Sequence, residues 1–181
     1  ILVKELREKE TMDEIEKIAK MISDTLSTEL NVKVYISIGT VVSDLKDVSR
    51  SYKEAKMALE VGKIFESDKY IVNYERLGIG RLIYQLPLSL CKMFIKEVLH
   101  GLTMDDFDDE TLATVNKFFE NNLNVSETSR QLYIHRNTLV YRLDKLQKMT
   151  GLDLRNFDDA IIFKITLMVS KYMMYMDKMV Y

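Results

Sequence analysis

The side chains best suited to binding a ligand lie in one stretch of the chain, residues 124–146. Polar and cationic residues recur there along one expected helix: Arg136, Asn137, Thr138, Tyr141, Arg142 and Lys145. Asparagine can read adenine through two hydrogen bonds, arginine can read guanine or hold a phosphate, and threonine or tyrosine can do either. These residue types predict contact with double-stranded DNA, with Asn137 and Tyr141 best placed to reach bases.

A short helix is expected just ahead of these residues, at positions 126–132. Ser126 can accept a hydrogen bond from the first turn and so cap this helix. Thr128 and Ser129 are small enough to let a second helix cross it closely. In that arrangement Ser126, Thr128 and Arg130 would secure the first helix to the DNA backbone.

A tight turn and a second, longer helix are expected next. Residues 133–135 form the turn, in which Ile134 would fill the corner and His135 would cap the second helix or touch a phosphate. The second helix is expected at Arg136–Met149. Its inward stripe consists of Leu139, Leu143 and Leu146, and its opposite side carries Asn137, Tyr141 and Lys145. Reading a major groove requires this combination of two helices, a tight turn and a polar second helix.

The distribution of charge favours the same interpretation. Between Asn124 and Met149 five cations oppose two carboxylates, whereas the whole chain has a net charge of −2. An anionic partner would therefore be attracted by this segment and not by an overall basic field. The pattern by itself also fits a helical hairpin with a solvated basic side.

A family resemblance separates these two interpretations. The run Ile134-His-Arg-Asn-Thr-Leu-Val-Tyr-Arg-Leu143, preceded by Asn124-Val-Ser-Glu-Thr-Ser-Arg-Gln-Leu132, resembles the C-terminal helix-turn-helix of the PucR/CdaR transcription regulators. Ser129 departs from that family, which usually has alanine there. The resemblance implies a DNA-binding regulator of a catabolic or metabolic operon that acts as a homodimer or higher oligomer.

The first 75 residues alternate helix and strand patterns. The expected elements are a strand at Ile1–Val3, a helix at Met12–Thr28, a strand at Lys33–Val42, a helix at Val48–Val61 ended by Gly62, and a strand at Tyr70–Tyr74. Ser37-Ile-Gly-Thr40 and Ser51-Tyr-Lys-Glu-Ala55 resemble the second half of the GGDEF-like domain of CdaR-type proteins. We therefore expect a partial GGDEF-like α/β domain here, with its first half and any effector-sensing domain upstream of Ile1.

The rest of the chain is expected to be helical. A helical connector is expected at residues 76–110, broken at Pro87 and ending in the acidic stretch Met104–Glu110. That stretch is interpreted as a solvated loop and domain boundary; a metal site is the less favoured alternative. An all-α helix-turn-helix domain is expected at residues 111–181, so the predicted fold class is α+β.

Several other functions are disfavoured by the residues present. Nucleotide cyclase chemistry needs a glycine-rich hairpin and metal-binding carboxylates, and the chain has no Gly-Gly pair. His100 and His135 lack a recognisable nucleophile partner, so we expect no enzyme, no cofactor and no metal. The single cysteine, Cys91, and the lack of a long apolar run fit a cytoplasmic protein. The alternative left open is a protein-interaction or dimerisation module built on the methionine-rich segment Leu167–Met176.

Overall fold

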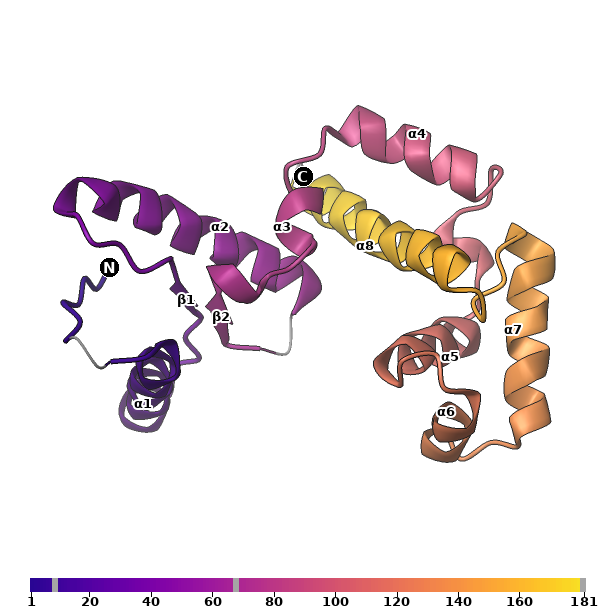
Figure 1. The fold of residues 1–181 in the computed structure, drawn as a ribbon, viewed down its shortest axis with the longest axis horizontal. Coiled ribbons are helices and arrows are strands. Elements are labelled where there is room, and N and C mark those ends of the chain that lie inside the picture. The colour runs from indigo at the N-terminus through magenta and orange to yellow at the C-terminus, as the bar shows by residue number, and fades with distance from the viewer. Residues whose placement is uncertain (8–9, 67–68, 180–181) are drawn as a thin grey trace. The chain divides into compact units, whose positions relative to one another are not determined.

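The computed structural model describes residues 1–7, 10–66 and 69–179. The chain folds into two compact units, Ile1–Tyr84 and Gln85–Tyr181 (Figure 1). The first combines helices with short strands and the second is helical throughout its described residues, which confirms the α+β class. The segment 76–110, expected as one connector, is divided between the units at Tyr84.

The first unit contains a parallel strand–helix–strand arrangement. Its elements are α1 (Met12–Leu30), β1 (Ile36–Ile38), α2 (Val48–Phe65), β2 (Ile71–Asn73) and the short α3 (Gly80–Ile83). β1 and β2 pair in parallel, with Ile36 opposite Ile71 and Ile38 opposite Asn73. Parallel neighbours need a crossover connection, and α2 supplies it. Arg76, just after β2, bonds Glu16 at 2.8 Å and Asp13 at 3.0 Å on α1.

Two expectations for this unit are wrong. Ile1–Val3 is exposed and forms no strand, because none of the described segments pairs with its backbone. Gly62 does not end the helix, since α2 continues to Phe65. Gly62 is buried instead, and a Cβ there would lie 2.6 Å from Cγ2 of Val72. The glycine therefore serves the close packing of α2 on β2.

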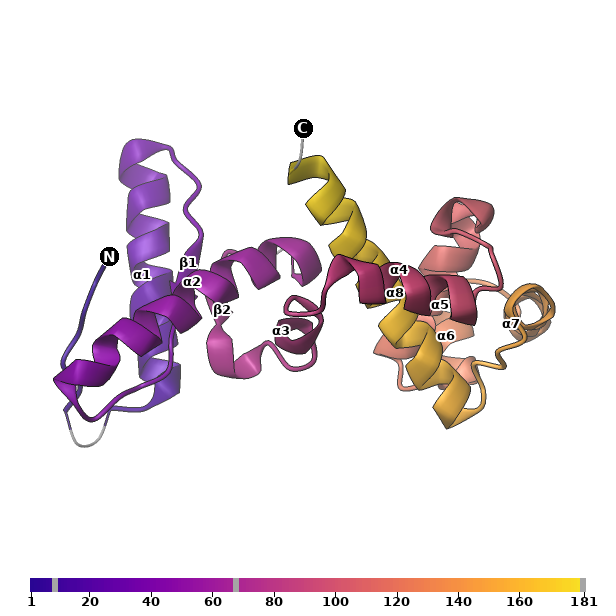
Figure 2. The ribbon, with the colours of Figure 1, turned by 90° about the horizontal axis from the view of Figure 1, so that it is seen from above.

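The second unit contains five α-helices, which pack around one core. They are α4 (Leu88–Val98), α5 (Asp109–Glu120), α6 (Val125–Gln131), α7 (Arg136–Thr150) and α8 (Phe157–Met179), counted over the described part of the unit. Pro87 immediately precedes α4, as the expected break predicts. α4 packs across α8 (Figure 2), and α7 contacts both α5 and α6.

The core of this unit joins all the elements that hold α7. Its largest buried side chains are Leu99, Phe118, Leu139, Leu143, Leu146, Leu154 and Phe163. Phe107 joins them from within the acidic stretch and meets Phe163 edge to face, with ring centroids 6.0 Å apart. That stretch is thus anchored by an aromatic side chain and is more than a solvated loop. No helix in the described residues has the length and apolar character to cross a membrane.

We predict that Gly39→Ala destabilises the first unit. A Cβ at Gly39 would lie 2.1 Å from the backbone oxygen of Ser51, so β1 and the start of α2 would have to separate. The expected loss is about 1–3 kcal/mol of unfolding free energy, measured by chemical denaturation, with faster hydrogen exchange in β1 and α2. Ser49→Ala, at an exposed position of α2, is the control and should change neither quantity appreciably. Equal stability of the two variants would contradict the close approach.

Candidate nucleic-acid interface

The start of α6 is fixed by an asparagine cap. The side chain of Asn124 accepts a hydrogen bond from the backbone N–H of Glu127 at 3.0 Å. Asparagine is among the strongest caps because its short carbonyl reaches the free N–H groups of the first turn. The expected cap at Ser126 is therefore wrong: Ser126 lies inside the helix, with its side chain exposed.

The turn between α6 and α7 alternates between inward and outward side chains. Ile134 donates its backbone N–H to the carbonyl of Ser129 at 3.0 Å, and its side chain packs against the core, as expected. Tyr133 has a φ of +56°, a left-handed conformation that is uncommon for an aromatic residue. This conformation turns Tyr133 outward, where it is 95% exposed.

α7 has the two-sided character that the sequence predicts. Leu139, Leu143 and Leu146 are buried, whereas Asn137 and Tyr141 are exposed. His135 caps the helix: its Nδ1 accepts the backbone N–H of Asn137 at 3.2 Å. These observations confirm the inward leucine stripe and the histidine cap.

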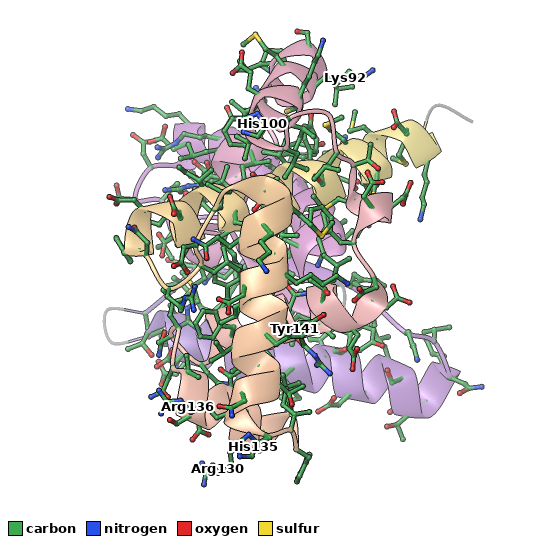
Figure 3. All side chains as sticks on the ribbon, turned by 90° about the vertical axis from the view of Figure 1, so that its right-hand side faces the viewer. Lys92, His100, Arg130, His135, Arg136 and Tyr141 are labelled. Atoms are coloured by element: carbon green, nitrogen blue, oxygen red, sulfur yellow. The ribbon has the colours of Figure 1, made fainter. Side chains whose placement is uncertain are left out.

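Cationic and polar side chains gather at the N-terminal end of α7. Figure 3 shows Arg130 of α6 beside His135 and Arg136, with Tyr141 further along the outer side of α7. Among the described residues, Arg136 makes no ion pair. Arg130 is bonded to Glu127 at 2.7 Å, which lowers the pKa of that carboxyl, with a smaller contribution from Gln131. In the part of the chain that the structure describes, Arg136 thus keeps its charge uncompensated by an ion pair.

Further along α7, two cations are held by acidic residues of α5 and its cap. Arg142 donates to the Thr114 hydroxyl at 2.9 Å and pairs with Glu110, and its side chain is only 15% exposed. Lys145 Nζ lies 2.6 Å from Oδ2 of Asp108. The hydrogen bond from Lys145, followed by one from Thr111, lowers the pKa of Asp108, and the same pair raises the pKa of Lys145. The positive charge of α7 is therefore partly neutralised within the protein.

Comparison with known families matches both units of this architecture. Residues 111–169 match the PucR C-terminal helix-turn-helix domain, and residues 1–61 match the GGDEF-like domain. The chain therefore combines a GGDEF-like domain with a PucR-type C-terminal helix-turn-helix domain. The match at 111–169 contains α6, α7 and all but the first two residues of α5, so the PucR-type domain is the part of the chain in which the candidate interface lies.

Two of the relatives that the chain matches are regulators by name. The purine catabolism regulatory protein of Bacillus subtilis is 28% identical over 147 residues, which are 81% of this chain and 28% of that protein. The carbohydrate diacid regulator of Escherichia coli is 31% identical over 136 residues, 75% of this chain and 35% of that protein. The chain thus spans about a third of the length of these relatives. The solved structure of a regulator of polyketide synthase expression from Bifidobacterium adolescentis is also similar, with 22% sequence identity and a TM-score of 0.40. The aligned part is 68% of this chain and 50% of the regulator's chain.

One predicted contact residue of the PucR-type domain needs correction. Thr128 has no exposed surface and lies on α6, which packs against both α5 and α7. Its hydroxyl has no hydrogen-bond partner among the residues that the structure describes. Thr128 is a packing residue that cannot touch a phosphate in this conformation. The other nine predicted residues keep some surface, although Arg142 is largely covered.

Two features of the site escape sequence reasoning. The sequence predicts Tyr133 only as part of a turn. Three large side chains follow one another at Leu132, Tyr133 and Ile134, and nothing in the sequence indicates that Tyr133 is the exposed one of the three. The acidic residues Asp108 and Glu110 lie outside the segment whose charges attract attention, and only folding brings them to α7. Over the described residues, no group of histidine, cysteine and carboxylate side chains is arranged to hold a metal ion.

The buried threonines Thr128 and Thr114 provide a matched pair for testing this geometry. Thr128→Val removes a hydroxyl that has no partner in the described structure, so stability should stay within about 1 kcal/mol or rise. Thr114→Val removes the hydroxyl that Arg142 bonds, and should cost about 1–3 kcal/mol. Denaturant unfolding of both variants measures the difference. A larger loss for Thr128→Val would show that its hydroxyl has a partner after all.

Proposed function

We propose that this chain acts as a DNA-binding transcription regulator, with α6 and α7 as its reading unit and α7 placed in a major groove. The observation that carries the proposal is the polarity of α7, whose leucines are buried while Asn137 and Tyr141 face outward. A recognition helix needs this division, since its inner side must hold it while its outer side bonds base edges. The regulatory role of the relatives supports the same proposal.

The proposed DNA contacts are of two kinds, those to base edges and those to phosphates. Asn137 and Tyr141 are best placed for bases, with Thr138 beside them. Phosphate contacts are assigned to Arg136, Lys145 and the N-terminal cluster, which consists of Ser126, Arg130 and His135. We add Tyr133 to the phosphate contacts, because it lies in the turn before His135 and its ring, which carries a hydroxyl, is exposed. Arg142, which the sequence also predicts as a DNA contact, is assigned chiefly to positioning α7 through its bonds to α5.

A single helix-turn-helix has a small interface, so we further propose that two copies of the protein bind paired half-sites. A regulator of this kind would act in the cytoplasm, on a catabolic or metabolic operon, and would receive its signal from another part of the protein. The chain itself is assigned no catalytic step.

Phosphate contact by Arg136 has a distinctive salt signature. A protein that loses one phosphate contact should show a slope of log affinity against log salt reduced by about 0.9. We expect this reduction, with weaker binding at every salt concentration, for Arg136→Ala titrated against a mixed-sequence duplex by fluorescence anisotropy.

Lys92→Ala is the matched control for Arg136→Ala, because it removes one exposed cation from α4, at the opposite end of the unit (Figure 3). Lys92→Ala should leave affinity and slope nearly unchanged. Wild-type protein that fails to bind duplex DNA at any salt concentration would overturn the proposed function and favour a protein-interaction module.

Base reading by Asn137 predicts a loss of specificity in addition to a loss of affinity. Asn137→Ala should cost about 1–3 kcal/mol on the preferred sequence, with little change on mixed-sequence DNA. The preferred sequence can be obtained by repeated selection of a random duplex pool with the wild-type protein. The affinities of the wild-type protein and of Asn137→Ala for the selected sequence are then compared. If Asn137→Ala selects the same base at every position, Asn137 does not read DNA.

A further inference from the structure

Two of the cations on the second half of α7, Arg142 and Lys145, are held in different ways. Arg142 is mostly covered and has two partners on α5, the Thr114 hydroxyl and the Glu110 carboxylate. Within the described residues Lys145 forms an ion pair with one carboxylate, that of Asp108, and both side chains of that pair are about half exposed, at 45% and 50%. Exposed ion pairs contribute little to stability and exchange partners readily. Lys145 can therefore leave Asp108, whereas Arg142 is held in place.

The position of Lys145 along α7 suits a phosphate. It lies eight residues beyond Asn137, which corresponds to about 12 Å along a helix axis. The major groove of B-form DNA is about 12 Å wide. Since only about half of that width separates the middle of the groove from its wall, a helix that crosses the groove obliquely with Asn137 at a base edge would bring Lys145 to the phosphates.

Asp108 uses its two carboxylate oxygens for different tasks. Oδ1 accepts the backbone N–H of Thr111 at 2.7 Å and so caps α5, whereas Oδ2 holds Lys145 at 2.6 Å. An asparagine at this position would keep the oxygen that caps the helix and would lose the negative charge. The cap and the ion pair can therefore be separated by one substitution.

We infer that Asp108 competes with DNA for Lys145. In the free protein the Asp108 carboxylate pairs with the Lys145 ammonium group, where a phosphate would bind in the complex, and this competition limits the affinity of the protein for DNA. This inference rests on the proposed function and adds a residue outside the helix-turn-helix that tunes it. Binding would require Lys145 to exchange one anionic oxygen for another, and the released carboxylate would then lie close to the DNA backbone. Both effects lower the gain from this contact.

Removing the charge of Asp108 should strengthen DNA binding. For Asp108→Asn in the full 181-residue chain, we expect about two- to five-fold tighter binding to a mixed-sequence duplex at low salt. The slope of log affinity against log salt should steepen by up to about 0.9, because Lys145 then displaces DNA counterions without a bound carboxylate. Asp108→Ser, which also caps helices without a charge, repeats the test should the asparagine variant fold poorly.

Two comparisons separate the competition from a general charge effect. Asp109→Asn removes the same charge from the next residue, which is exposed and has no ion pair within the described ranges. It should change affinity by less than Asp108→Asn. In a Lys145→Ala background, Asp108→Asn should give no more than the Asp109→Asn gain.

The inference is overturned if both aspartate variants bind equally tightly, or if the gain persists without Lys145. Its failure can be told apart from failure of the proposed function. A salt slope reduced by about 0.9 in Arg136→Ala, together with an unchanged affinity for Asp108→Asn, overturns the competition alone. Wild-type protein that does not bind duplex DNA overturns both.

Discussion

Burial of three leucines on α7 is the constraint on which the candidate interface depends. Leu139, Leu143 and Leu146 share one core with Phe118 of α5 and Phe163 of α8. Burying a leucine side chain contributes about 1.5–3 kcal/mol, so the stripe determines the rotation of α7 about its own axis. Once that rotation is set, the exposure of Asn137 and Tyr141 follows without any further interaction. Truncating one leucine would loosen the presentation of the whole outer side.

Electrostatics refine what packing sets. Arg142 ties α7 to α5 through Thr114 and Glu110, at a position where the leucine stripe meets the outer side. The bonded arginine limits rotation of α7, whereas Lys145, which is about half exposed, carries its charge at the surface. Acidic residues at the start of α5 are also favourable for that helix, because its N-terminal end carries a partial positive charge. The same carboxylates therefore stabilise α5 and reduce the net charge of the interface.

The GGDEF-like unit is organised by close backbone approaches. Gly39 passes within contact distance of the Ser51 carbonyl, and Gly62 lets α2 lie directly on Val72 of β2. Both contacts leave no room for a Cβ, so small residues here maintain the packing of the crossover helix on the strands. This unit also carries the surface ion pairs of Arg76, which link the segment after β2 to α1.

Much of the second unit could be predicted from local pattern. The period of Leu139, Leu143 and Leu146 predicts both the helix and its inward side, and the ability of His135 to bond the first turn predicts a cap. Such features depend on residues within a few positions of one another, so the chain reports them directly. The family resemblance had the same local origin, in the run from Ile134 to Leu143, and the match of residues 111–169 confirmed it.

The order of residues along the chain thus determined most of the elements, the outward side of α7 and the family resemblance. Tertiary structure alone decided that Thr128 is sealed, that Tyr133 points outward, and that Asp108 holds Lys145, 37 positions away. The physical reason is that helix spacing reports which side a residue occupies, whereas exposure and charge pairing depend on what another segment places against that side. A lysine or arginine in the sequence therefore contributes an unpaired charge only if folding places no carboxylate from another segment beside it.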